Sequence, residues 1–156
     1  MVSLFVSVEK LANEAAELIR AFFPNETVDL GTKEKSGEYS FLIKSEFDDA
    51  KWRTELLHDG KSIVCEKKTA PKLDEEDDIL YKRRIKGALK ETVYTALKEF
   101  TGRSLPYGML TGVRPLTPAK RYLAEYTPSI AEELLQKELD VSPAKASLLT
   151  ETALVQ

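Results

Sequence analysis

The dipeptide Asp59-Gly60 stands between two runs of alternating apolar and polar residues, Lys51–Leu57 and Ser62–Lys67. Aspartate followed by glycine suits the two positive φ angles of a tight hairpin turn, and no other short signal predicts a hairpin as strongly. We therefore expect an antiparallel strand pair here, and any fold of this chain has to be built around that pair.

Other segments of the first seventy residues extend this sheet and add a helix. Alternation predicts strands over residues 2–8 and Tyr39–Phe47, and Thr27–Leu30 is a candidate for a short one. Apolar residues recur at helical spacing over Lys10–Phe23, and Pro24 ends that helix. This part of the chain is typical of a helix packed on a small, mainly antiparallel sheet.

An acidic segment precedes a long predicted helix. Residues 70–78 hold five consecutive carboxylates. We interpret them as a solvated connector rather than a divalent-cation site, because Asp77 and Asp78 stand where carboxylates stabilise a helix N-terminus. The helix should run to about Phe100, with Gly102 as its stop. Its apolar stripe comprises Ile85, Ala88, Leu89, Thr92, Val93, Ala96, Leu97 and Phe100.

Three further helices are predicted, each from a serine or threonine that directly precedes a proline. Thr117, Thr127 and Ser142 can act as N-caps, with proline at the first helical position. The expected helices are Pro118–Glu125, Pro128–Glu138 and Pro143–Val155.

The predicted fold class is α+β, a small mainly antiparallel sheet with one or two helices, followed by a helical subdomain. The expected division is an α+β subdomain over residues 1–72, the connector and long helix over 73–104, and a Gly/Pro loop with three helices over 105–156. Because the last predicted helix reaches the end of the sequence, we expect the chain to belong to a longer protein.

The chain has one cysteine, Cys65, and one histidine, His58. An iron–sulfur cluster, a structural zinc site and a disulfide each need more such residues than one chain offers. We therefore expect no metal site. A lone cysteine, no leader peptide and no apolar run of membrane-spanning length together predict a cytoplasmic protein without membrane association.

Charge is distributed unevenly along the chain. Residues 79–125 carry ten Lys/Arg against three Asp/Glu, whereas the whole chain has a formal net charge of −3. An electrostatic binding role would therefore belong to the middle third.

A loop rich in glycine and proline follows the long helix. It reads Tyr107-Gly-Met-Leu-Thr-Gly-Val-Arg-Pro115. Glycines permit positive φ and close approach of a ligand or another backbone. Backbone amides beside Thr111 and Arg114 could hold a carboxylate or phosphate. The alternative, which the chemistry alone favours, is a tightly packed interhelical connection in which the glycines only relieve crowding.

This loop resembles a segment of HemZ-type oxygen-independent coproporphyrinogen III oxidases, also called coproporphyrinogen dehydrogenases, of the radical SAM superfamily. In that family an aromatic-Gly-aliphatic-Leu-Thr-Gly-aliphatic-Arg-Pro segment lies upstream of the catalytic barrel, and the match here covers roughly Tyr81–Leu123. The family's Cys-x3-Cys-x2-Cys motif is absent and would be expected beyond Gln156. The resemblance implies a parent oxidoreductase of porphyrin and heme biosynthesis that uses a [4Fe–4S] cluster and S-adenosylmethionine.

Under that resemblance this chain carries no catalytic residue or cofactor and serves as an accessory N-terminal domain. It would pack on or cover the intramolecular radical SAM domain, and it could contact the propionates of a tetracarboxylate porphyrinogen. The substrate-binding candidates are Arg114 first, whose planar fork suits a carboxylate, then Thr111, Gly112, Lys120 and Arg121. The residues assigned to the structural motif are Tyr107, Gly108, Leu110 and Pro115. The family usually has Thr-Lys directly after Arg-Pro, so the match does not place its lysine on Lys120.

Two other function classes remain open. A nucleic-acid-binding module could use the basic residues of helix 82–90, with a helix-turn-helix around residues 140–143. This is disfavoured because the second helix of that motif would have only Lys145 as a basic residue. A pure protein-interaction module would expose an apolar patch on the C-terminal helices, drawn from Ile130, Leu134, Leu135, Leu148, Leu149 and Leu154.

Three single residues are expected to have structural roles rather than to form a site. His58 is expected to be an exposed turn residue, Cys65 a small buried hydrophobe, and Trp52 a residue that packs on the sheet.

Overall fold

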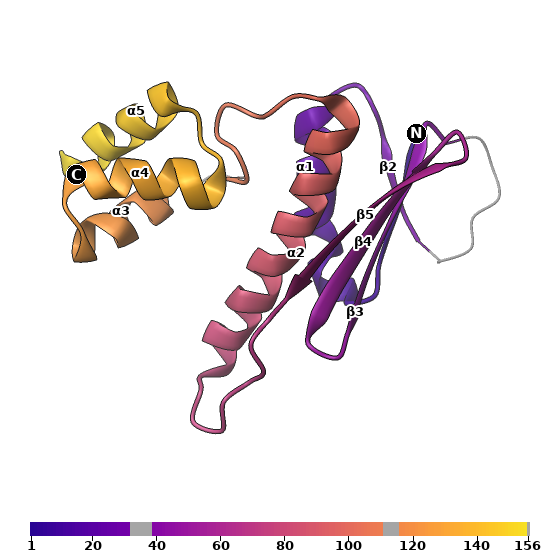
Figure 1. Cartoon of the computed structure of the whole chain (residues 1–156), viewed down its shortest axis with the longest axis horizontal. Helices are drawn as coiled ribbons and strands as arrows, with labels where there is room; N and C mark the ends of the chain where they lie inside the picture. Colours follow the sequence, from indigo (N-terminus) through magenta and orange to yellow (C-terminus); the bar gives the residue numbers. More distant parts are fainter. Residues whose placement is uncertain (32–38, 111–115, 156) are drawn as a thin grey trace. The chain divides into compact units, whose positions relative to one another are not determined.

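The computed structural model describes residues 1–31, 39–110 and 116–155, which form two compact units, Met1–Gly102 and Arg103–Gln156 (Figure 1). The first unit contains a five-stranded sheet and two α-helices, and the second contains three helices. The predicted α+β class is confirmed.

The sheet has the strand order β2-β1-β3-β4-β5. β1 pairs in parallel with both β2 and β3, and β3-β4 and β4-β5 are the longer, antiparallel pairings. The strands are β1 (Val2–Val6), β2 (Val28–Leu30), β3 (Phe41–Asp48), β4 (Lys51–His58) and β5 (Lys61–Lys68).

Two tight hairpin turns build the antiparallel half. The predicted turn between β4 and β5 has positive φ at Asp59 (48°) and Gly60 (75°), as this turn type requires. The turn between β3 and β4 uses Asp49 and Ala50, with φ of 51° and 57°. Alanine rarely adopts this conformation, so no sequence signal marked the second turn.

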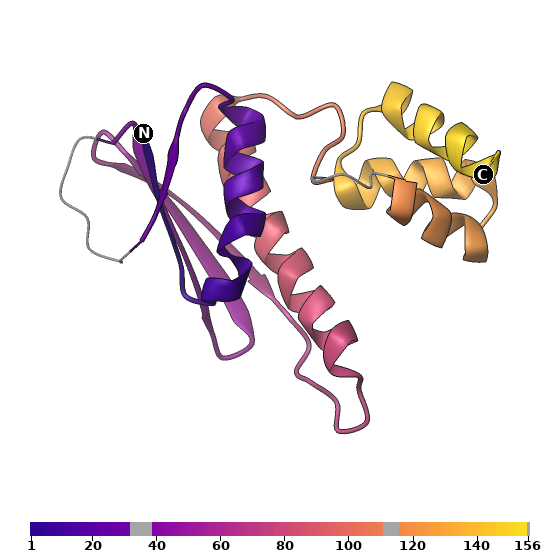
Figure 2. The same ribbon diagram turned by 180° about the vertical axis from the view of Figure 1, so that it is seen from behind.

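Both helices of the first unit lie on one face of the sheet (Figure 2). They are α1 (Ala12–Phe22), which follows a short 3-10 helix over Glu9–Leu11, and α2 (Asp78–Thr101). Trp52 is fully buried beneath α2 and its indole N–H donates to the carbonyl of Ile85 at 3.0 Å. The prediction that Trp52 packs on the sheet is therefore confirmed.

A buried chain of hydroxyl groups joins the sheet to α2. Ser45 and Thr54 share a hydrogen bond of 2.8 Å across β3 and β4, and Thr54 donates to Thr92 on α2 at 2.8 Å. Thr92 in turn donates to the carbonyl of Leu89. Each buried hydroxyl is thus satisfied, which a buried polar group requires.

The acidic connector is anchored to α2 by ion pairs. Asp77 caps α2 by accepting from the amide of Ile79 at 2.9 Å, and Gly102 ends the helix with φ of 70°. The Arg84 guanidinium binds the Glu76 carboxylate and the carbonyl of Ala70. Residues 70–75, 77 and 78 of the connector are exposed, as the predicted solvated connector requires, and the guanidinium of Arg84 partly covers Glu76.

The second unit consists of α3 (Leu116–Glu125), α4 (Pro128–Leu139) and α5 (Pro143–Leu154). Thr127 and Ser142 cap α4 and α5 as predicted. The predicted cap at Thr117 is wrong, because α3 already begins at Leu116 and Thr117 therefore lies inside the helix. The buried core of this unit is Ala119, Leu135, Val141, Ala146, Leu149 and Ala153.

His58 ends β4 beside the turn and its side chain is 40% exposed, in line with the prediction. Its Nδ1 lies 2.9 Å from the carbonyl oxygen of Ser40, and its ring packs edge-on against Phe100 at 5.0 Å. The prediction for Cys65 needs correction. Cys65 is only half-buried because β5 is an edge strand, and this partial burial raises the pKa of the thiol.

Candidate functional site

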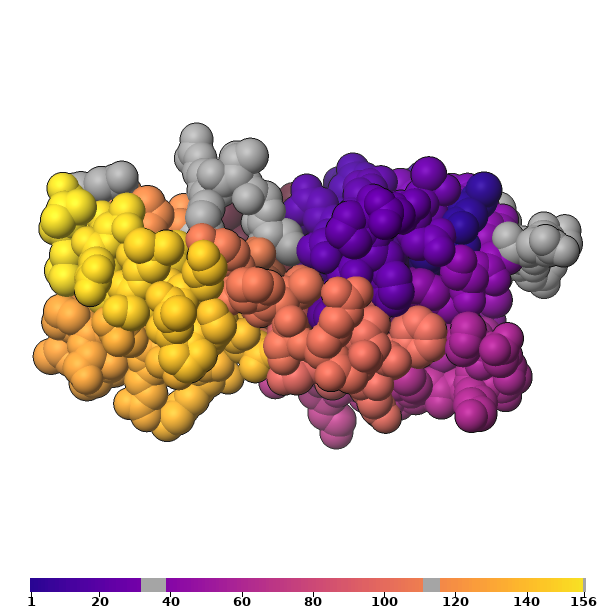
Figure 3. All heavy atoms as spheres, turned by 90° about the horizontal axis from the view of Figure 1, so that it is seen from above, coloured from indigo at the N-terminus to yellow at the C-terminus, as the bar shows by residue number. Residues whose placement is uncertain are grey.

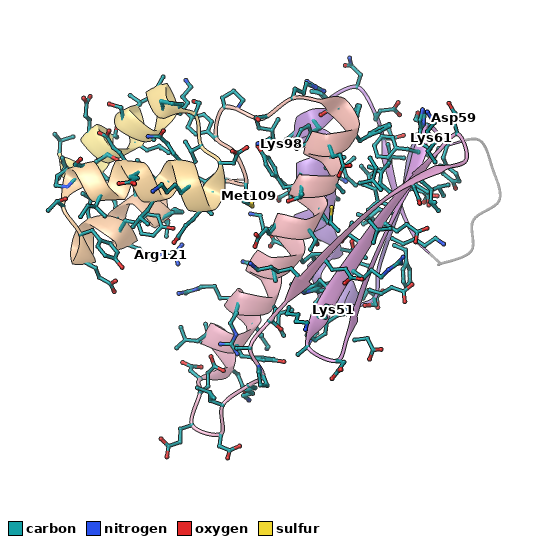
Figure 4. The ribbon with its side chains drawn as sticks, in the orientation of Figure 1. Lys51, Asp59, Lys61, Lys98, Met109 and Arg121 are labelled. Atoms are coloured by element: carbon teal, nitrogen blue, oxygen red, sulfur yellow. The ribbon has the colours of Figure 1, made fainter. Side chains whose placement is uncertain are left out.

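The loop that carries the family resemblance packs against the connection between α4 and α5. The amide of Met109 donates to the carbonyl of Leu139 at 2.8 Å, and the amide of Ser142 donates to the carbonyl of Pro106 at 2.9 Å. Figure 4 labels Met109 at this contact. Two backbone hydrogen bonds thus clamp Pro106–Met109 onto the helical unit.

Gly108 allows this close approach. Its φ is +59°, and an added β-carbon would lie 1.9 Å from the carbonyl oxygen of Leu139. The close neighbour of this glycine is therefore the protein's own backbone, which corresponds to the interhelical packing interpretation for this half of the loop. Thr111, Gly112, Arg114 and Pro115 lie outside the described residues.

The aromatic and aliphatic residues of the loop contribute to the same packing. Tyr107 and Leu110 lie against the core of the helical unit. The ammonium group of Lys145, the lone basic residue of α5, lies over the Tyr107 ring at 5.3 Å from its centroid. Lys145 is thereby engaged within the unit by a cation–π contact.

A hollow of about 400 Å³ lies beside Arg121, between α3 and α4. Its polar lining includes Tyr122, whose hydroxyl donates to the Glu138 carboxylate at 2.7 Å, together with Glu125. Burial raises the pKa of the Tyr122 hydroxyl well above its ordinary value, and the hydrogen bond to Glu138 raises that pKa further. Arg121 itself is exposed and projects from the unit's surface (Figure 4).

The charge of this hollow does not suit a polyanion. Its lining combines the single guanidinium of Arg121 with the carboxylates of Glu125 and Glu138. Lys120 is exposed but does not line the hollow. Two negative charges against one positive charge favour a zwitterion or a cation over a tetracarboxylate. Of the described candidates, the structure therefore provides a binding environment only for Arg121, and that environment is acidic.

Helix α5 is apolar on two opposite faces. Its inner face buries Ala146, Leu149 and Ala153 in the core. Its outer face exposes Leu148, and Val155 is exposed directly after the helix, with 47% and 84% of their surface accessible. Large apolar side chains that gather on an exposed helix face are typical of interaction surfaces. In Figure 3, the yellow atoms of α5 form much of the C-terminal unit's visible face. Two positions of the predicted apolar patch, Leu148 and Leu154, are thus exposed, whereas Leu149 of the same patch is buried.

Part of the basic stretch of α2 is engaged by neighbouring groups, whereas Lys82 and Arg83 are exposed. Arg84 binds Glu76, and the ammonium of Lys86 lies 3.9 Å from the carboxylate of Glu14. Lys90 is half-buried, and its desolvation lowers the pKa of its ammonium group. The stretch therefore offers less free positive charge than its sequence suggests, which weakens the nucleic-acid interpretation.

Over residues 1–31, 39–110 and 116–155 there is no group of three or more His, Cys, Asp or Glu side chains placed to hold a metal ion. Within the same ranges, no helix combines the length and apolar character needed to cross a membrane. No protein-family model, curated protein or solved structure matches this chain.

Proposed function

We propose that this chain is an accessory domain of a radical SAM oxidoreductase similar to oxygen-independent coproporphyrinogen III oxidase, and that its helical unit packs on the catalytic domain through the outer face of α5. The observation that carries the packing role is the exposure of the apolar Leu148 on α5 and of Val155 directly after it, on the side of the helix away from its buried residues Ala146, Leu149 and Ala153. The resemblance over Tyr107–Pro115 supplies the family.

The chemistry of the outer face supports a protein partner rather than a nucleic acid. The charged residue on the outer face of α5 is the acidic Glu151. The lysine of α5, Lys145, makes a cation–π contact with the Tyr107 ring. A recognition helix needs arginine, asparagine or several lysines to read base edges. A low-charge apolar helix face fits the core of a protein interface, where charged residues are depleted. A cytoplasmic location is part of the same proposal and rests on the lone, unpaired Cys65.

The packing proposal predicts that Leu148→Lys weakens binding to a radical SAM domain of the coproporphyrinogen dehydrogenase type. A lysine at the centre of the interface would be desolvated there, and we expect affinity to fall by about tenfold or more. Calorimetry on the separately produced catalytic domain measures the effect. Leu73→Lys is the matched control, because Leu73 is 67% exposed on the connector of the first unit.

Equal binding by the two lysine variants would remove α5 from the interface. Absence of any binding at about 100 μM, which corresponds to roughly −5.5 kcal/mol, would contradict the proposal as a whole. A wild-type dimer in solution that Leu148→Lys dissociates would assign the face to a second copy of this chain instead.

Direct contact with the substrate's propionates is the second part of the proposal. We expect coproporphyrin III, which carries four carboxylates, to bind the full chain, with binding weakened by Arg114→Ala. Arg121→Ala should change affinity less than Arg114→Ala, because Glu125 and Glu138 share the Arg121 hollow. Absorbance titration measures both variants. Equal affinity in wild type and Arg114→Ala would remove Arg114 from the site.

A further inference from the structure

Strand β5 forms one edge of the sheet, with β4 on one side and no strand of the described residues on the other. Its register with β4 continues over all of Lys61–Lys68 without a bulge, and it contains no proline. Of the devices by which proteins block an edge against further pairing, short length, bulges and prolines are thus absent from β5, whereas lysines are present. The backbone of β5 can therefore accept another strand, and its lysines restrict which strand that is.

The direction of the backbone groups along β5 follows from its pairing with β4. The amide of Thr69 donates to the carbonyl of Ala50 at 2.7 Å, directly after the opposed pair Lys51 and Lys68. In an antiparallel pair, residues that exchange hydrogen bonds alternate with residues that do not. The odd-numbered residues of β5 therefore bond to β4, whereas the even-numbered ones direct their N–H and C=O groups away from it. These outward residues are Ser62, Val64, Glu66 and Lys68.

The side chains of β5 divide between the two faces of the sheet. Cys65 stands opposite Thr54, whose hydroxyl donates to Thr92 on α2, so the odd-numbered side chains lie on the face that α2 covers. The even-numbered side chains lie on the other face, and all four are exposed, Val64 by 43%. The outward peptide groups thus belong to residues whose side chains are exposed as well.

Strand β5 has an excess of positive charge. It carries three lysines and one glutamate, Glu66. The Glu66 carboxylate lies 3.3 Å from the ammonium of Lys51 and 3.8 Å from the guanidinium of Arg53, both on β4. Since β4 neutralises the one carboxylate of β5, the lysines determine the charge of this edge.

The lysines at the two ends of β5 select the partner. Lys61 and Lys68 are exposed, and neither has an ion-pair partner among the described residues. The third lysine, Lys67, lies 3.4 Å from the carboxylate of Glu91 on α2. A second copy of β5 would bring further lysines to this edge, whereas a strand with a carboxylate opposite each end would neutralise both ends.

We infer that the edge of β5 binds an extended acidic segment of a partner protein, which adds to the five-stranded sheet as a further strand. Main-chain hydrogen bonds to the even-numbered residues hold the segment, as in other complexes formed by strand addition. Each residue of an added strand stands opposite one residue of β5, so carboxylates spaced as Lys61 and Lys68 are reach both lysines at once. β-branched residues between the carboxylates suit the strand conformation. The site lies in the first unit and is independent of the function proposed for the second.

The probe is the acetylated and amidated peptide Glu-Thr-Val-Thr-Val-Thr-Val-Glu, titrated into the full, isotope-labelled chain. In the free chain, we expect the amides of Ser62, Val64 and Glu66 to exchange with solvent faster than those of Ile63 and Cys65, which bond to β4. The peptide should slow exchange at the even-numbered positions. Equally slow exchange along the whole free strand, or no change at about 1 mM peptide, which corresponds to roughly −4.1 kcal/mol, would overturn the inference.

A second peptide, in which lysine replaces both glutamates, tests the role of charge. Like charges that stand opposite one another destabilise a strand pair, so we expect the lysine peptide to bind about tenfold more weakly. Equal affinity of the two peptides would overturn the assignment to an acidic partner. A dimer of the wild-type chain in analytical ultracentrifugation, with the even-numbered amides of β5 protected from exchange, would overturn it in favour of a second copy.

A variant of the chain tests the backbone contact. Val64→Pro removes an N–H that points away from β4, and proline is tolerated at such positions of an edge strand, so the β4–β5 pairing is kept. We expect Val64→Pro to bind the acidic peptide about tenfold more weakly or worse, because it loses a hydrogen bond and the ring obstructs the edge. Val64→Thr, which keeps the N–H, is the matched control and should bind as the wild type does.

Methylated peptides repeat this test with the wild-type chain. In the antiparallel register that places the two glutamates opposite Lys61 and Lys68, the fifth peptide residue stands opposite Val64. Methylation of its amide nitrogen should weaken binding about tenfold or more, whereas methylation of the fourth amide, which points away from β5, should not. Equal binding by Val64→Pro and Val64→Thr, or of the two methylated peptides, would overturn the inference.

Discussion

Single residues decide the local backbone path at a few positions, and Gly108 is the clearest. Its positive φ and its contact with the carbonyls of Leu139 and Asp140 leave no space for a side chain. By contrast, Gly87 lies within α2 with nothing within 4 Å of an added β-carbon. Residue type alone therefore does not distinguish a required glycine from a replaceable one.

Gly108→Ala should destabilise the helical unit by about 3 kcal/mol or more, since strained backbone and a backbone clash add together. Gly87→Ala is the matched control and should stabilise the chain by about 0.5–1 kcal/mol, because alanine is the better helix former. Denaturant unfolding followed by far-ultraviolet circular dichroism measures both. An unchanged midpoint for Gly108→Ala would mean that the loop relaxes away from α4.

At the scale of elements, the connector between β5 and α2 is organised by ion pairs as well as by helix capping. Glu76 binds Arg84, while Lys72 binds Asp78 in the first turn of α2. The hydrogen bond from the Arg84 guanidinium holds the pKa of the Glu76 carboxyl below its ordinary value of 4.5. Proton binding at Glu76 and unfolding are therefore coupled.

A lowered pKa in the folded state means that the unfolded chain binds the proton more readily. The contribution of Glu76 is therefore complete at pH values above its unfolded pKa and is lost as the pH falls below about 4.5. We expect Glu76→Gln to reduce the loss of stability between about pH 5 and 3. Denaturant midpoints across this range measure it, with Glu75→Gln, at an exposed position, as the control. If the denaturant midpoints of wild type and both variants changed with pH in the same way, the proposed role of the Glu76–Arg84 ion pair would be contradicted.

At the scale of the whole molecule, the chain divides into two compact units after Gly102. Each unit has its own buried core, centred on Trp52, Leu89 and Leu97 in the first and on Leu135 and Leu149 in the second. The only tryptophan lies in the first unit, so its fluorescence reports on that unit alone. In Gly108→Ala, the denaturant midpoint followed by tryptophan fluorescence should be unchanged. The midpoint followed by far-ultraviolet circular dichroism should fall, because the helical unit is destabilised.

The sequence by itself determined the elements whose signals are local. The Asp59-Gly60 turn, the caps Asp77, Thr127 and Ser142, and the stop at Gly102 all lie where turn and capping chemistry predicts them. These signals are readable because each depends on the φ preference or side-chain reach of one residue and its nearest neighbours.

Tertiary structure alone decided the features that depend on distant partners. The turn at Asp49-Ala50 runs against residue preference and persists because the β3–β4 pairing holds it on both sides. The parallel pairing of β1 with β2 and β3 joins segments that are far apart in the chain. No local pattern encodes which strand lies beside which, because that choice follows from the joint burial of α1 and α2 on one face of the sheet.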